Sequence, residues 1–88
     1  MIKVERMVTN MEFKNVDRFE TSEKLRRMMR KAGKTVLDIQ YELRLTSPSS
    51  VYSWTQGRAL PSVDNLVKLT QIFNCKMEDL IVLEGENE

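Results

Sequence analysis

Residues 46–61, with the sequence TSPSSVYSWTQGRALP, predict a short helix that has its own start and stop signals. Ser47 can accept a hydrogen bond from a backbone amide of the first turn, and Pro48 suits the first helical position, where no N–H partner is needed. Gly57 is expected to end the helix in the left-handed conformation that glycine tolerates best. A helix of about two to three turns is marginal alone, so neighbouring segments must hold it in place.

The two faces of this predicted helix differ in character. Val51 and Trp54 are three residues apart and share the inner face, so both are expected in a core. The outer face carries hydroxyl and amide side chains, which suit close approach to a polyanion or to base edges. Its residues are Ser49, Ser50, Tyr52, Ser53 and Gln56. An ordinary solvated helix face is the alternative interpretation.

Length and composition indicate one small domain, because 88 residues with 41% hydrophobic side chains can build a compact core. The single cysteine, Cys75, excludes an intramolecular disulfide framework and is expected to be a buried small hydrophobe. No apolar run approaches the roughly 18 residues of a membrane span, and no signal-peptide core is visible. The cytoplasm is therefore the expected location.

The net charge of +1 conceals an uneven distribution. Residues 24–34 hold six basic side chains and no acidic one, whereas residues 77–88 hold five acidic side chains and no basic one. A nearly neutral chain can therefore present a basic face beside an acidic tail. A solvated helix face and a solubilising tail are the simpler interpretations, and we prefer the latter for the tail.

Hydrophobic spacing and capping residues predict four further helices. The first and the fourth are expected to end at Gly33 and Asn74 in the left-handed conformation. The second and third are separated by only a few residues, so they must meet at a steep angle, as in a helix-turn-helix. The five helices are expected to begin near Thr21 or Ser22, Thr35, Ser47, Ser62 and Lys76. The expected core is Leu25, Met28, Ile39, Leu43, Val51, Trp54, Leu66, Phe73 and Leu80.

Residues 1–20 allow two interpretations. Ile2, Val4 and Val8 alternate with polar neighbours, and Thr9-Asn10 can turn the chain, which indicates a β-hairpin. A flexible arm is the alternative, because chain termini are often poorly ordered. The predicted organisation is an N-terminal arm at 1–20, a helical domain at 21–83 and an acidic tail at 84–88.

From Leu25 to Leu83 the chain resembles the Cro/repressor-type helix-turn-helix domain, also called the XRE family. The resemblance is carried by the turn Gly33-Lys34-Thr35, residues 51–62, Asp64-Asn65-Leu66 and residues 73–80. It implies a compact, all-α, five-helix lambda-repressor-like domain whose third helix enters the major groove of DNA. It also implies a bacterial or phage transcription regulator, most often a repressor, that acts as a homodimer on a palindromic operator.

The resemblance implies base-reading positions on the outer face of the third helix, at Ser49, Tyr52 and Ser53. The start of the second helix, at Thr35, is expected to attract a phosphate through its free N–H groups, and Arg58 through its charge. The expected DNA-binding residues are Lys34, Thr35, Ser47, Pro48, Ser49, Ser50, Tyr52, Ser53, Gln56 and Arg58.

Several positions depart from the family pattern. An ion pair often links the first and third helices, but here the two positions are Met29 and Thr55, for which we expect a direct contact instead. Gln40 replaces a small residue of the second helix and is expected to reach the surface or a backbone partner. Arg44 replaces the usual glycine of the turn, at a cost of about 1 kcal/mol if the left-handed geometry persists. One extra residue in this turn loosens the base-reading assignments.

An enzyme is not expected. The sequence has no histidine, no cluster of metal ligands, no Gly-rich phosphate loop and no nucleophile beside a base, so no catalytic site, metal or cofactor is predicted. No membrane or small-molecule partner is predicted either. Two classes remain, a sequence-specific DNA-binding regulator and a protein-interaction module such as an antitoxin-like partner with the same fold. The lack of Arg and Lys on the outer face of the third helix slightly favours the second class.

Overall fold

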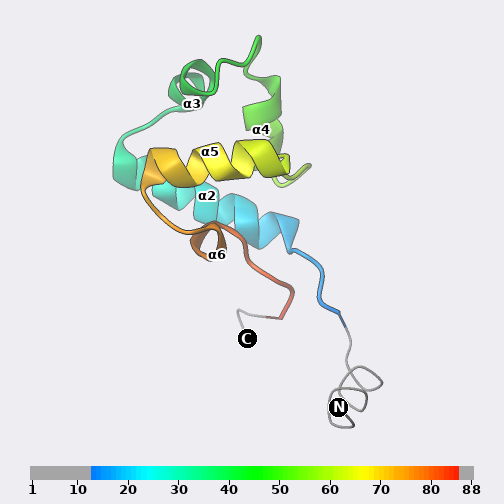
Figure 1. Ribbon diagram of the computed structural model, residues 1–88. Helices are drawn as coiled ribbons and strands as arrows, with labels where there is room; N and C mark the ends of the chain where they lie inside the picture. The colour runs from blue at the N-terminus through cyan, green and yellow to red at the C-terminus, as the bar shows by residue number, and fades with distance from the viewer. Residues whose placement is uncertain (1–12, 86–88) are drawn as a thin grey trace, which may run out of the picture.

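The computed structural model describes residues 13–85, and in this range the chain forms five α-helices and no extended strand. They are α2 (Arg18–Ala32), α3 (Val36–Glu42), α4 (Ser49–Thr55), α5 (Val63–Phe73) and α6 (Met77–Leu80). Helix α4 packs against α2 and α3, while α5 packs against α2 and α6. Figure 1 shows α3 and α4 at one end of the molecule and α6 toward the other. The prediction of an all-α, five-helix domain is confirmed.

Helix α2 begins at Arg18, earlier than the expected start at Thr21 or Ser22. Asp17 is the cap, and its carboxylate accepts a hydrogen bond of 2.9 Å from the Glu20 amide. Thr21 is instead buried inside the helix, where its hydroxyl accepts a hydrogen bond of 3.0 Å from the amide of Val82. The expected start was wrong because Asp17 and Thr21 can both cap a helix in front of the same apolar stripe. The Thr21 hydroxyl is engaged by Val82, near the C-terminal end of the described chain, so Asp17 is the cap.

The other helix boundaries agree more closely with the sequence. Thr35 and Ser62 cap α3 and α5 through their hydroxyls, and α6 starts after Lys76. Gly33 and Asn74 are left-handed, with φ of 69° and 54°. These signals are local, which is why the sequence reveals them.

The start of α4 differs slightly from the prediction. Pro48 occupies the capping position, not the first helical one, and its carbonyl accepts the first helical hydrogen bond, 3.0 Å from the Tyr52 amide. The Ser47 hydroxyl accepts a long hydrogen bond, 3.4 Å, from the amide of Ser49 in the first turn, while the cap residue itself makes no side-chain bond to α4. The shift is only one residue, and the dihedral angles of Pro48, −81° and −1°, lie close to the helical region.

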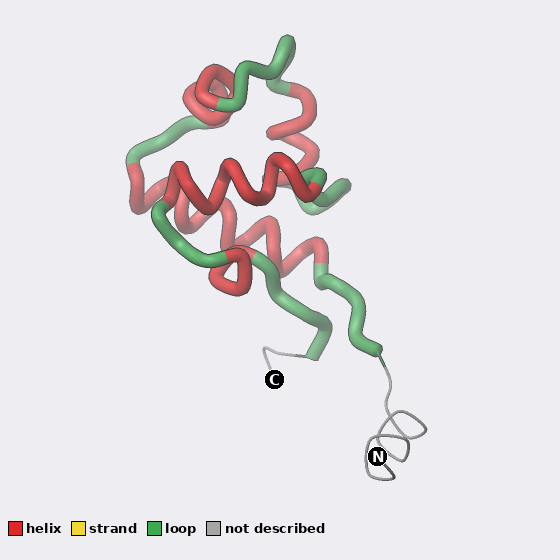
Figure 2. Tube along the Cα trace, in the orientation of Figure 1, coloured by secondary structure: helices red, strands yellow, loops and turns green. Residues whose placement is uncertain are grey.

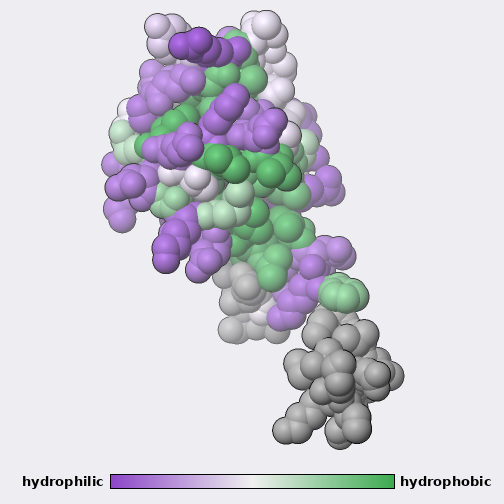
Figure 3. All heavy atoms as spheres, viewed as in Figure 1, coloured by the Kyte–Doolittle hydropathy of each residue, from purple (hydrophilic) through white to green (hydrophobic). Residues whose placement is uncertain are grey.

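The core lies between α2, α3, α4 and α5. Six of the nine expected core residues are buried, and Met28 and Phe73 pack against them while partly exposed. Leu66 lies at the edge of this core, half-buried, and Leu69 fills the centre of the α5 interface with no exposed surface. The buried residues that form the core cluster are Leu25, Met29, Ile39, Leu43, Val51, Trp54, Leu69 and Leu80. Figure 3 shows that hydrophobic side chains also gather on the surface over α5.

Cys75 packs against this core and is partly buried. Burial raises the pKa of its thiol, and the nearby Asp79 carboxylate raises the pKa further. The thiol is therefore protonated at neutral pH, which agrees with the expectation of a small hydrophobe rather than a reactive group.

The segments on either side of the helices are tied together. Val16 and Leu83 form an antiparallel β-bridge, flanked by hydrogen bonds of 2.8 Å from the Asp17 amide to the Val82 carbonyl and of 2.9 Å from the Glu84 amide to the Asn15 carbonyl. Of the hairpin or arm expected at residues 1–20, residues 18–20 belong to α2, and residues 1–12 lie outside the described residues.

Within residues 13–85, none of the helices has the length and apolar character needed to span a membrane.

Candidate nucleic-acid interface

Helix α4 presents one apolar face to the core and one polar face to solvent. Val51 is fully buried and Trp54 is 6% exposed, so the predicted inner face is confirmed. The outer face is exposed except for Ser53, which is half-buried. Because α4 is anchored by Val51 and Trp54, its outer face keeps a fixed direction relative to the core. The exposed residues are Ser49, Ser50, Tyr52 and Gln56.

A pair of hydroxyls lies at the N-terminal end of α4. The Ser47 and Ser49 oxygens are 2.6 Å apart, and both side chains are exposed. Each hydroxyl can donate one hydrogen bond and accept others, so the pair can exchange this mutual bond for one to a base edge or a phosphate. The small side chains leave the backbone of this end open to close approach.

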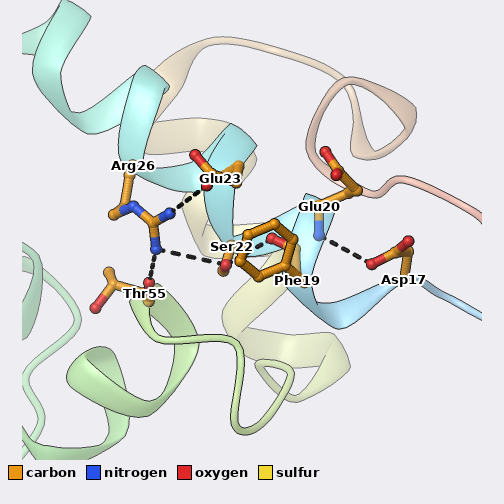
Figure 4. Close-up of polar contacts among 7 residues, drawn as sticks. All are labelled: Asp17, Phe19, Glu20, Ser22, Glu23, Arg26 and Thr55. Carbon is orange, nitrogen blue, oxygen red and sulfur yellow. Dashed lines mark hydrogen bonds and ion pairs between the residues drawn. The ribbon is translucent and has the colours of Figure 1, made fainter. Parts of the chain in front are cut away.

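The C-terminal end of α4 is fastened to α2 by Arg26 (Figure 4). Its guanidinium donates to the backbone carbonyl of Thr55 and, at 3.5 Å, to the hydroxyl of Ser22. An ion pair of 2.9 Å with Glu23 on the same helix holds the guanidinium in place. The charged group thus reaches a last-turn carbonyl of α4, where the helix dipole favours a cation.

This arrangement bears on the expected contact between Met29 and Thr55. Both residues are buried, but the polar link between α2 and α4 is made by Arg26, nearly one turn earlier than Met29. The Thr55 hydroxyl donates instead to the carbonyl of Tyr52, at 3.0 Å. The sequence did not reveal this link, because the two partners are 29 residues apart and the acceptor is a backbone atom.

Gly57 and Arg58 follow α4 at a point where the chain runs close to α2. Gly57 has φ of 75°, and a side chain there would start 3.4 Å from the Cα atom of Phe19. The Arg58 carbonyl accepts a 3.1 Å hydrogen bond from the guanidinium of Arg18. The backbone of Arg58 is therefore fixed while its own side chain is exposed.

The start of α3 differs from the open anion site that the sequence suggested. The Asp38 carboxylate accepts a 2.8 Å hydrogen bond from the Thr35 amide, and the Asp38 amide donates to the Thr35 hydroxyl at 3.1 Å. The bond from the Thr35 amide, helped by the Thr35 hydroxyl and by the charge of Lys34, holds the pKa of Asp38 below its ordinary value. At neutral pH the ionised carboxylate therefore occupies the helix start, and its negative charge opposes a phosphate at that point.

Lys34 is also engaged. Its ammonium forms an ion pair with the carboxylate of Glu42 at the opposite end of α3. Both side chains are about one-third exposed, so the pair is weak and can exchange for another partner. Lys34 is thus a less available cation than its position in the sequence suggested.

The turn between α3 and α4 contains a cation that the expected site did not include. Arg44 is exposed and left-handed, with φ of 58°, so the left-handed geometry of the turn persists without glycine. The Gln40 side chain donates to the carbonyl of Leu45 at 3.2 Å, which confirms the expected backbone partner. The signal for Arg44 was present in the sequence, since it stands where the family carries glycine.

Among residues 13–85, no cluster of His, Cys, Asp or Glu side chains is placed to hold a metal ion.

The comparison with curated proteins found no match. A family model for the Cro/C1-type helix-turn-helix DNA-binding domain matches residues 24–86. The chain belongs to this family. A DNA-binding regulator is the function that this membership supports.

Proposed function

We propose that the protein is a sequence-specific transcription regulator that places α4 in the major groove of double-stranded DNA. The observation that carries the proposal is the exposed hydroxyl face of α4, held rigidly by Val51 and Trp54 in a domain of a DNA-binding family. A groove about 12 Å wide admits a helix, and hydroxyls can donate to or accept from base edges.

The proposed roles follow from chemistry and position. Ser49 and Ser53 read base edges, while Tyr52, which is 43% exposed, contacts a thymine methyl group or a phosphate. Arg58 contacts a phosphate beyond the end of α4. Neighbouring side chains of the same surface complete the interface, namely Ser47, Pro48, Ser50 and Gln56. Lys34 and Thr35 contribute more weakly.

The proposed regulator is a repressor that acts as a homodimer on a palindromic operator, with half-sites about 34 Å apart. It works in the cytoplasm, without enzymatic activity.

Salt-dependent binding tests this function. The chain is titrated into the labelled promoter of its own gene and into a mixed-sequence duplex of equal length, over a salt series. We expect binding to both duplexes that weakens with salt, because phosphate contacts release counterions, and tighter binding to the promoter. An absence of salt-dependent binding to either duplex would contradict the proposal.

A protein-interaction module is the second candidate, because the outer face of α4 has no Arg or Lys. This candidate predicts no salt-dependent DNA binding, and it predicts loss of a protein partner when Ser49 or Tyr52 is changed.

A further inference from the structure

Arg44 has a backbone conformation that its side chain does not favour. Its φ is 58°, a region where residues with a Cβ atom are strained and where glycine or asparagine is preferred. Among residues 13–85, Asn74 is the other non-glycine residue with positive φ, and it ends α5 as asparagine commonly does. Of these two residues, Arg44 is the one whose positive φ is not explained by the chemistry of its side chain.

The turn around Arg44 is fixed by its neighbours. Leu43 is buried in the core, and Leu45 is partly buried and packs against it. The Arg44 amide donates to the Tyr41 carbonyl at 3.0 Å, and the Leu45 amide donates to the Gln40 carbonyl at the same distance. A change in the Arg44 backbone would disturb these two hydrogen bonds and the packing of both leucines. Strain that persists in this way often accompanies a functional role of the strained residue.

The charge of Arg44 is available for a partner. Its side chain is exposed, and it makes no ion pair with any residue between 13 and 85. The nearest acid in sequence, Glu42, is engaged by Lys34. The turn projects at the end of the molecule that carries α3 and α4, away from α6 (Figures 1 and 2). An exposed guanidinium carried by a fixed turn is well suited to bind an anion.

Arg44 and Arg58 lie in the chain on either side of α4. The helix has seven residues and is therefore about 10 Å long, close to the width of about 12 Å of the major groove. A helix whose outer face has no cation needs charges at its ends to hold it against the phosphate backbones. Arg58 supplies one beyond the C-terminal end, and Arg44 is the matching exposed cation before the N-terminal end.

We propose that Arg44 binds a phosphate of the DNA backbone and, together with Arg58, holds α4 in the groove from its two ends. The inference rests on the proposed DNA-binding function. A shallow hollow beside Arg44 is lined by Leu37, Gln40, Tyr41 and Leu45, and it offers the sugar-phosphate edge an apolar surface. Tyr41, which is 82% exposed, can add its hydroxyl to the same phosphate.

Variants of Arg44 separate its charge from its backbone conformation. Arg44→Asn removes the charge but keeps a residue that tolerates positive φ, so the thermal unfolding midpoint should not fall. Arg44→Lys keeps both the charge and the strain. Arg27→Ala is the control, because Arg27 is an exposed cation on the side of α2 that faces α6, near Cys75 and Asp79.

Binding of each variant to a fluorescent mixed-sequence duplex of about 30 base pairs is measured by anisotropy over a salt series. Arg44→Asn should bind several-fold more weakly, with a slope of log affinity against log salt that is shallower by about 0.9, the contribution of one phosphate. Arg44→Lys should keep the slope of the parent, because an ammonium also neutralises a phosphate. Arg27→Ala should bind as the parent does.

Two results would overturn the inference while leaving the proposed function intact. One is an Arg44→Asn variant with the affinity and slope of the parent, in which case the exposed Leu37 and Tyr41 surface would fit a protein partner instead. The other is an Arg44→Lys variant that loses as much slope as Arg44→Asn, because a charge kept at this position would then neutralise no phosphate. If the parent itself shows no salt-dependent binding, the proposed function fails first.

Discussion

Trp54 and Tyr52 are two aromatic side chains of one short helix with opposite environments. Trp54 is 6% exposed and belongs to the core, whereas Tyr52 is 43% exposed on the outer face. Trp54→Ala should lower the free energy of unfolding by about 3–5 kcal/mol, because it removes a large buried side chain and leaves a cavity. Tyr52→Ala should change it by no more than about 0.5 kcal/mol.

Chemical denaturation of the two variants tests this assignment of faces. Equal losses of stability in Trp54→Ala and Tyr52→Ala would mean that α4 is rotated relative to the core, and the proposed reading face would then be wrong.

For single residues, the sequence predicted the burial of some side chains well and the polar contacts of others poorly. The burial of Val51 and Trp54 and the exposure of Ser49 follow from helical periodicity alone. The pairing of Lys34 with Glu42 does not follow from periodicity. The two flexible side chains start from opposite ends of α3 and reach toward each other. The bond between Thr35 and Asp38 was readable in principle, since a threonine followed three residues later by an acid is a capping-box pattern.

At the scale of elements, Arg26 links α2 to the C-terminal end of α4. Arg26→Ala removes the charged donor to the Thr55 carbonyl and should lower the free energy of unfolding by about 1.5 kcal/mol, the low end for charged hydrogen bonds, because the guanidinium is 34% exposed. We also expect weaker DNA binding, since α4 loses its fixed orientation.

Arg27→Ala is again the matched control, as it removes the same charge from the same helix without touching α4. If both variants bound DNA and unfolded alike, Arg26 would be an ordinary surface charge.

The capping box of α3 gives the protein a pH dependence in acid. The pKa of Asp38 is lowered by its bonds from Thr35, so the ionised form is favoured in the folded state. Its stabilising contribution is fully present above the ordinary value of 3.8 and is lost as pH falls through the lower folded value. In Asp38→Asn the side-chain oxygen can still accept the bond from the Thr35 amide, but the charge is gone.

Thermal unfolding of the parent and of Asp38→Asn, measured from neutral pH down to about pH 3, tests this coupling. The parent should be the more stable of the two at neutral pH, and the difference should shrink on acidification. A difference that stays constant across this range would exclude Asp38 as a source of the acid sensitivity.

The element boundaries show what local sequence can and cannot specify. The ends of α2 and α5 follow from Gly33 and Asn74, because a left-handed residue stops a helix wherever it occurs. The start of α2 depends on the bond between Thr21 and Val82, which are 61 residues apart, and no local pattern contains it. The link from Arg26 to Thr55 was missed for the same reason.

At the scale of the whole molecule, the two ends of the described chain lie together, away from the turn between α3 and α4 (Figure 1). An assembly made near these ends would leave α4 free to meet DNA. We propose that residues 1–12, whose apolar side chains alternate with polar ones, contribute to a homodimer contact. Residues 13–16 must be kept, because Val16 pairs with Leu83.

Sedimentation of the chain with and without residues 1–12 tests this proposal. The full chain should sediment as a dimer at micromolar concentration and the shortened chain as a monomer with unchanged helix content. The same mass for both chains would remove these residues from the interface.

The central claim is that the outer face of α4 reads base edges, and selection from a pool of randomised duplexes tests it most directly. The parent, Ser49→Ala, Ser53→Ala and Gln71→Ala are each used to enrich bound sequences, with Gln71 as an exposed control on α5. We predict that the parent enriches a defined sequence and that each serine variant loses about 1–3 kcal/mol of preference at one base position. Gln71→Ala should keep the preference of the parent. An enriched sequence that neither serine substitution alters would contradict the claim.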